Sequence, residues 1–207
     1  MTDNEDKRKY ILSGLETFLK NKGFKKKGFS FKRETETGLL QIIELRLGPS
    51  WSINSGQINL GFGIFSDEWH KFLNRWKMPS TIRTADCEIR DCYCNIVDQG
   101  DNHNWFKLAN SLNDLILNLI NLLEKNILPY LDRHKTRSNI LESYNKFGEK
   151  MGLPPRHKLS VAILTYGMGK KEKGLQLVYE EFLANLKNPF YVGVYETIKN
   201  ELPQTTA

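Results

Sequence analysis

The chain has 207 residues, of which 40% are apolar and 26% are charged, and 30 basic against 24 acidic residues give a net charge of +6. This composition is typical of a globular protein with a sizeable core and excludes an intrinsically disordered chain, while the modest positive excess permits an acidic partner without requiring one. The most apolar run, 112–123, is interrupted by Asn and Asp, and the first residues are polar. We therefore expect a cytoplasmic protein with no membrane span and no signal peptide.

The amino-terminal part of the chain predicts a helix. Ile11, Leu15, Phe18 and Leu19 follow the spacing of a helix that packs one face on a core. Gly23 fits the left-handed position that ends helices. The basic stretch after it predicts a turn.

Three strands are predicted next. The first begins at Phe29 and Phe31, whose side chains alternation directs toward the core, and the second covers 39–47. The third covers 51–65, with an apolar face opposite a polar one. Its apolar face consists of Ile58, Leu60, Phe62 and Ile64, and its polar face of Gln57, Asn59, Gly61 and Gly63.

The remaining elements complete an α+β fold. Residues 67–79 predict a short helix or an ordered loop, 87–96 a further strand, and 105–127 a long helix that Pro129 ends or kinks. We expect an antiparallel sheet of about four to five strands, packed against the amino-terminal and long central helices, over residues 1–133. An all-helical appendage is expected over 134–207, with helices at 140–147, 159–166, 175–186 and 191–198.

Several short stretches, and the order in which they occur, resemble the family known as domain of unknown function 4304 over about residues 5–135. The resembling stretches are Gly23–Arg33, Gln57–Gly61, Cys87–Arg90, Trp105 and Ile127–Asp132. The resemblance implies a small α+β domain with helices on one side of an antiparallel sheet, and it brings no catalytic residues. Some small bacterial families of this character are immunity or defence proteins, which is an analogy.

The polar face of the third strand is the first candidate binding surface. Gln57, Asn59, Gly61 and Gly63 form a flat strip that allows close approach of a partner or ligand. The alternative is a solvated outer face. Trp51 and Trp69 would supply aromatic anchors.

The basic stretch that follows the first helix is the candidate for nucleic acid. It contains Lys25, Lys26, Lys27, Lys32 and Arg33. Lysines contact phosphates, but they also protect a sheet edge from aggregation.

Two further chemistries receive less support. Cys87, Cys92 and Cys94 fall on a predicted strand rather than on turns, so we expect buried side chains and no metal or cofactor. Asp101 and His103 could form an acid–base pair of a hydrolase, although a polar turn and helix cap explains them equally well.

The sequence therefore favours a non-enzymatic, protein-binding module, related to immunity or defence. A nucleic-acid-binding protein is the alternative, and a hydrolase is the weaker one.

Overall fold

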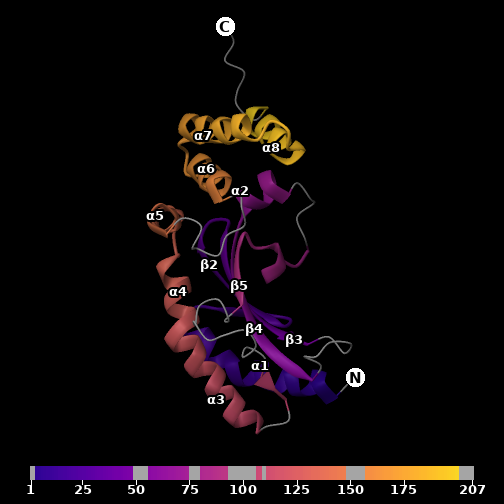
Figure 1. Cartoon of the computed structure of the whole chain (residues 1–207). Coiled ribbons are helices and arrows are strands. Elements are labelled where there is room, and N and C mark those ends of the chain that lie inside the picture. The colour runs from indigo at the N-terminus through magenta and orange to yellow at the C-terminus, as the bar shows by residue number, and fades with distance from the viewer. Residues whose placement is uncertain are drawn as a thin grey trace. The chain divides into compact units, whose positions relative to one another are not determined.

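The computed structural model describes residues 3–48, 56–74, 80–92, 106–108, 111–147 and 157–200. The chain divides into two compact units (Figure 1). The sheet unit comprises Met1–Phe65 and Ile82–Lys135, and the helical unit comprises Ser66–Thr81 and Thr136–Ala207. The predicted domain boundary at residue 133 remains a prediction.

Helix α1, Asp3–Asn21, opens the sheet unit. Its first turn is acidic, which suits the positive end of the helix dipole, and it buries Ile11, Leu12, Leu15 and Leu19. Gly23 ends the helix at φ 85°, a left-handed conformation that only glycine adopts without strain. The predicted helix and its stop are both present.

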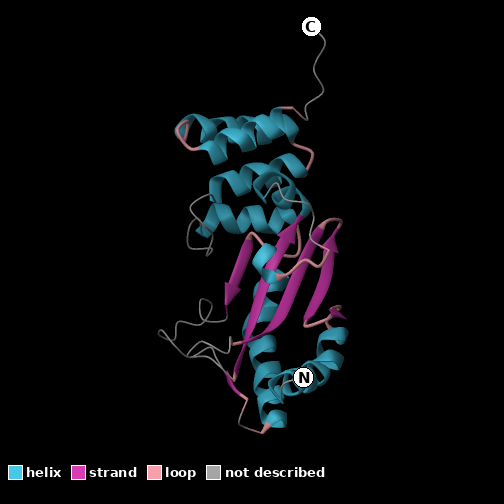
Figure 2. Cartoon of the chain, turned by 90° about the vertical axis from the view of Figure 1, so that its right-hand side faces the viewer, coloured by secondary structure: helices cyan, strands magenta, loops and turns pink. Residues whose placement is uncertain are grey.

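Within the described residues the sheet has six strands, of which β1 to β5 lie in chain order while β6 pairs with β4 (Figure 2). The strands are β1 Lys25–Lys27, β2 Ser30–Glu36, β3 Leu39–Leu47, β4 Gln57–Ser66, β5 Ile89–Cys92 and β6 Phe106–Lys107. The predicted α+β fold with an antiparallel sheet is confirmed. The basic stretch, however, is the strand β1 rather than a turn, because Gly28 (φ 61°) folds it back as a hairpin onto β2.

The third predicted strand is present as β4, which begins at Gln57 within the described residues. The predicted beginning of that strand, 51–55, lies outside them. Phe29 differs from its prediction: it lies exposed in the β1–β2 turn, whereas Phe31 is buried. Alternation applies only within a strand, and Phe29 precedes β2.

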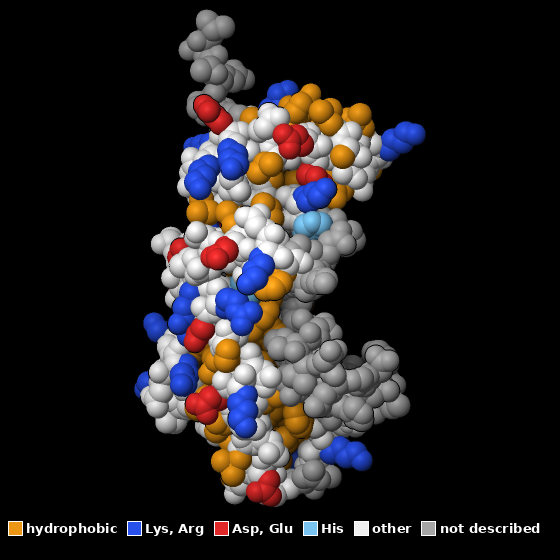
Figure 3. Space-filling view, turned by 60° about the vertical axis from the view of Figure 1, so that its left-hand side comes forward, with side chains coloured by type: hydrophobic (Ala, Val, Ile, Leu, Met, Phe, Trp, Pro, Cys, Tyr) orange, Lys and Arg blue, Asp and Glu red, His pale blue; other side chains and the backbone are white. Residues whose placement is uncertain are grey.

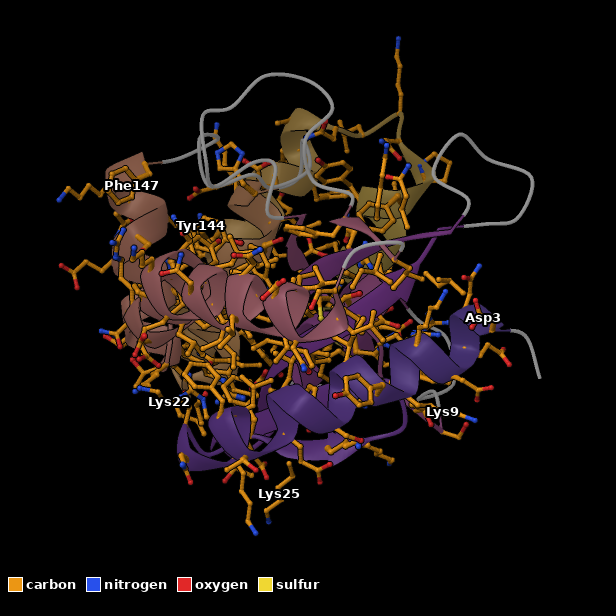
Figure 4. All side chains as sticks on the ribbon, turned by 90° about the horizontal axis from the view of Figure 1, so that it is seen from below. Asp3, Lys9, Lys22, Lys25, Tyr144 and Phe147 are labelled. Carbon is orange, nitrogen blue, oxygen red and sulfur yellow. The ribbon has the colours of Figure 1, made fainter. Side chains whose placement is uncertain are left out.

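Helices cover one face of this sheet. Helix α3, Leu112–Leu122, is followed by a π-helical turn, Leu123–Ile127, and by α4, Leu128–Arg133. Figure 4 shows α1 and α3 side by side, and these two helices are in contact. Phe62 of β4 meets Tyr130 of α4 with ring centroids 5.5 Å apart. This face is the main core of the sheet unit.

The long helix starts later than predicted. Residues 106–107 form β6, and the helix starts at Leu112 because the Ser111 side chain caps it by accepting from Asp114 N. At its other end, a π-helical turn over Leu123–Ile127 comes before Pro129 and helical structure continues to Arg133, so the helix does not end at this proline.

The helical unit combines an internal segment with the carboxy-terminal helices. The segment contains α2, Asp67–Trp69, and a π-helical turn, His70–Asn74. The other helices are α5 Arg137–Phe147, α6 His157–Gly167, α7 Lys171–Ala184 and α8 Pro189–Lys199. Trp69 Nε1 donates to Ser160 O over 3.0 Å, and Arg137 Nη2 lies 2.7 Å from Glu68 Oε1. These contacts join the internal segment to α5 and α6.

None of the helices in the described part of the chain is both long and apolar enough to cross a membrane.

Candidate functional site

The polar strip of β4 lies beneath other parts of the sheet unit. A Cβ atom on Gly61 would come within 2.6 Å of Arg46 Cζ, and one on Gly63 within 2.7 Å of Cys87 Sγ. Asn59 is buried and Gln57 is half-buried. The glycines do permit a close approach, as their spacing predicts, but the approaching groups belong to the chain itself.

Residues 82–88 cover this second face of the sheet. Ile82 and Cys87 pack with Ile42 and Phe65 in a small apolar cluster. The turn is fixed by Arg83 N, which donates to Asp86 Oδ2 over 2.7 Å. We call residues 82–88 the strap, because this segment covers the sheet face that the apolar–polar alternation of β4 would predict to be exposed to solvent.

A polar network joins the strap to β3. Its centre is the Glu44 carboxylate, whose side chain is only 5% exposed. Arg83 donates to Glu44 Oε1 from Nε over 2.9 Å and from Nη2 over 2.6 Å. The Thr84 hydroxyl donates to the other carboxylate oxygen and also accepts from Arg46 Nη2. The network therefore holds two guanidinium groups around one carboxylate.

Electrostatics keep this carboxylate ionised. Burial by itself would raise the pKa of Glu44, but the hydrogen bonds from Thr84 and Arg83, with the charges of Arg83 and Arg46, outweigh burial and hold the pKa below its ordinary value. A charged acceptor forms stronger hydrogen bonds than a neutral one. Glu44 thus anchors Arg83 while most of the Arg83 side chain, 62%, stays exposed.

Two more cations lie near this network. Lys32 Nζ donates to Ile82 O in the strap. Arg8 of α1 donates to Leu45 O from Nε over 2.9 Å, and its guanidinium carbon lies 3.7 Å from the centre of the Phe29 ring. We call Arg8, Lys32, Arg46 and Arg83 the cationic surface.

Elsewhere on the protein surface, basic and acidic side chains are mixed. On the face in Figure 3, Lys and Arg side chains are interspersed with Asp and Glu and with scattered hydrophobic groups. In the cationic surface, by comparison, four cations lie near two carboxylates, the buried Glu44 and Asp86 of the strap.

The residues of the nucleic-acid alternative separate into engaged and available groups. Arg33 Nη2 lies 2.7 Å from Asp132 Oδ1, its Nη1 donates to Lys22 O over 2.9 Å, and Lys26 Nζ lies 2.7 Å from Glu16 Oε2. Lys32 is engaged with the strap. Lys25 and Lys27 are exposed and have no ion pair among the described residues; Figure 4 shows the Lys25 side chain extending away from the ribbon.

The other predicted site residues do not reach this surface. Trp69 is buried in the helical unit, so a partner could reach it only if the helices around it separated. Trp51, Cys94, Asp101 and His103 lie outside the described residues, as does the side chain of Cys92. Cys87 is a buried thiol, and the described ranges hold no group of three or more His, Cys, Asp or Glu side chains that could share a metal ion.

Sequence reasoning missed the central residues of the cationic surface. Glu44 and Arg46 alternate with apolar residues on β3, which signals a polar face but not its depth. Arg83 and Thr84 lie in a turn without periodicity, so no pattern pointed to them.

Comparison with known proteins returns a family but no individual relative. Neither the curated proteins nor the solved structures contain a match to this chain. The model of the family described as Domain of unknown function (DUF4304) matches residues 15–133, which is more than half of the chain. The stretches Gly23–Arg33 and Ile127–Asp132, which carry the resemblance in the sequence, fall inside the match. The chain belongs to the DUF4304 family.

Proposed function

We propose that this protein is a non-enzymatic, protein-binding module that contacts an acidic segment of its partner through the cationic surface. The observation that carries the proposal is Arg83: its side chain is 62% exposed, yet two of its nitrogens are fixed on the buried Glu44 carboxylate. An exposed arginine on a surface is ordinarily mobile, whereas this one is held in place.

Pre-organisation is what makes such an arginine useful in an interface. Binding normally costs the side-chain entropy of the contact residues, about 0.5–1.5 kcal/mol for a long side chain. The Glu44 hydrogen bonds meet that cost during folding, before a partner arrives. Nη1 of Arg83 has no partner among the described residues and can donate to a carboxylate.

A protein partner fits the surface better than a nucleic acid does. Two of the five cations expected to contact phosphates, Lys26 and Arg33, are paired with the carboxylates of Glu16 and Asp132, and Lys32 Nζ donates to Ile82 O of the strap. Phe29, the exposed aromatic nearby, is covered by the Arg8 guanidinium rather than free for base stacking. The nucleic-acid alternative therefore rests on Lys25 and Lys27.

The role of this binding in the cell is a separate prediction. An immunity or defence function agrees with a protein partner, and it rests on the analogy with small bacterial families. The hydrolase alternative rests on Asp101 and His103, outside the described residues.

The proposal is tested by affinity purification from the native host with the wild-type protein, Arg83→Ala and Arg133→Ala as baits. Arg133 is an exposed arginine of α4 without a hydrogen bond or ion pair among the described residues, which makes it a matched control. We expect a stoichiometric protein to be retained by wild type and Arg133→Ala and to be depleted about tenfold by Arg83→Ala.

Two results would contradict the proposal. A partner that Arg83→Ala retains in full would place the interface elsewhere. Recovery of RNA or DNA instead of protein, lost when Lys25 and Lys27 are both replaced by Ala, would favour the nucleic-acid alternative.

A further inference from the structure

The outer strand β1 adds lysines to the same side of the sheet as the strap. Its register pairs Lys25 with Lys32, Lys26 with Phe31 and Lys27 with Ser30. Paired residues of neighbouring strands project from the same face. Lys25 and Lys27 therefore lie on the face of Lys32, whereas Lys26 lies on the opposite face, where it meets Glu16.

This register places like charges directly across from each other. Lys25 is opposite Lys32, an arrangement that destabilises an antiparallel pair. Burial, and then the charge of Lys27, lower the pKa of Lys32 from its ordinary value. Neither Lys25 nor Lys27 has an acidic partner among the described residues, although Lys26 in the same short strand has one. The charges of Glu44 and Asp86 offset part of this repulsion at Lys32, but Lys25 and Lys27 keep their charges without an ion pair among the described residues. A local conflict of this kind is typical of functional surfaces.

These lysines are continuous with the cationic surface. Lys32 connects β2 to the strap through Ile82 O, and the next strap residue is Arg83. The row therefore runs from Lys25 and Lys27 through Lys32 to Arg83. Its charge is complementary to an acidic chain that crosses from the sheet edge toward the strap.

The main chain of β1 offers a second kind of contact. β1 is the last strand on its side of the sheet among the described residues. An edge strand directs every second pair of N–H and C=O groups away from the sheet, where an extended chain can pair with them. Exposed lysines oppose pairing with a second copy of the same strand and favour an acidic one.

We propose that β1 accepts an extended acidic segment of the protein partner as an added strand, with its acidic side chains at alternate positions over Lys25 and Lys27. This inference rests on the proposed function, because it specifies the form of the partner at the same surface. Strand addition obtains affinity from main-chain hydrogen bonds and specificity from alternate side chains.

The test uses two labelled peptides of about eight residues with equal numbers of Glu and Thr, one strictly alternating and one with the glutamates in a block. Their binding to the full chain is measured by fluorescence anisotropy at low and moderate salt. Variants Lys25→Ala, Lys27→Ala and Arg83→Ala are compared with Lys26→Ala, which removes the same charge from the same strand on the opposite face. Lys25, Lys26 and Lys27 belong to an exposed strand and the Arg83 side chain is 62% exposed, and circular dichroism of each variant checks that it is folded.

The alternating peptide should bind more tightly than the block peptide, and Lys25→Ala and Lys27→Ala should each weaken it about threefold while Lys26→Ala leaves it unchanged. N-methylation of alternate peptide nitrogens on the pairing edge should abolish binding, because it removes the main-chain donors.

Other outcomes overturn the inference in distinguishable ways. If either peptide depends on Arg83 but not on Lys25 and Lys27, strand addition fails while the proposed function stands. Absence of binding by the alternating peptide, or indifference to N-methylation, also overturns it. Tighter binding of a single-stranded oligonucleotide of equal charge, lost in the same lysine variants, overturns both proposals in favour of nucleic acid.

Discussion

At the scale of single residues, the cationic surface depends on a glycine. Gly61 has no Cβ, and the Arg46 guanidinium occupies the space that a Cβ would need. Arg46 Cζ lies 2.6 Å from the position at which a Cβ on Gly61 would stand. Arg46 then reaches Thr84, which in turn donates to Glu44 and so supports the anchor of Arg83. The exposed arginine is thus positioned by contacts that begin on the buried strand β4.

We predict that Gly61→Ala lowers the free energy of unfolding by about 0.5–1.5 kcal/mol, because the added methyl displaces the Arg46 guanidinium from its hydrogen bond with Thr84. Thermal unfolding of the wild-type protein and of Gly61→Ala measures the effect. Arg46→Ala removes the obstructing group, so the double variant Gly61→Ala/Arg46→Ala should cost less than the sum of the single variants. Strict additivity of the two changes would show that Arg46 does not cover Gly61.

At the scale of elements, Arg33 fastens the helix layer to the sheet. From β2 it donates to Lys22 O after α1, to Gln41 Oε1 on β3 and to Asp132 Oδ1 on α4. Its guanidinium carbon also lies 4.5 Å from the centre of the Phe24 ring. A single planar fork therefore contacts four neighbouring parts of the chain.

Arg33→Ala should destabilise the protein by roughly 1–3 kcal/mol, since the buried side chain of Gln41 loses its donor. Arg33→Lys should recover little of this stability, because a lysine ammonium cannot reproduce the planar set of donors of the guanidinium. The midpoint of urea unfolding checks this, with Arg133→Ala, at an exposed arginine without a hydrogen bond or ion pair among the described residues, as the control that leaves stability unchanged. Full recovery by lysine would reduce the role of Arg33 to its charge.

Elements with clear periodicity could be predicted from the sequence, and those set by contacts between distant segments could not. The alternation of β3 and β4 and the spacing of α1 located these elements. β1 was missed because Lys25–Lys27 has no apolar alternation, and its strand state comes from pairing with β2. The polar strip was identified as a place of close approach, yet nothing in Ile82–Thr84 indicated that this segment would cover it.

At the scale of the whole molecule, the family match and the compact units do not share boundaries. The DUF4304 match runs without interruption over 15–133, whereas Ser66–Thr81 within it belongs to the helical unit. Trp69 and Phe72 are buried there, with Phe72 and Tyr166 rings 5.6 Å apart. The internal segment therefore requires helices from beyond residue 135.

A chain that ends at Lys135 should consequently expose Trp69 and Phe72. We expect it to bind the dye ANS and to aggregate at concentrations at which the full chain stays monodisperse in light scattering. A matched truncation with Trp69→Ser and Phe72→Ser should largely restore its solubility. If the unmodified truncation is as soluble as the full chain and binds no dye, the internal segment does not depend on the carboxy-terminal helices.

The interleaving of the two units also imposes an order in time. During synthesis, Ser66–Thr81 leaves the ribosome well before α5 to α8, so its apolar side chains must wait for more than half of the chain to be made. The sheet unit becomes complete once Lys135 has emerged, while the helical unit can close only near the end of translation. The interval between these two events is when the nascent protein is most open to capture by a chaperone or to misassembly, and a slower ribosome would lengthen it.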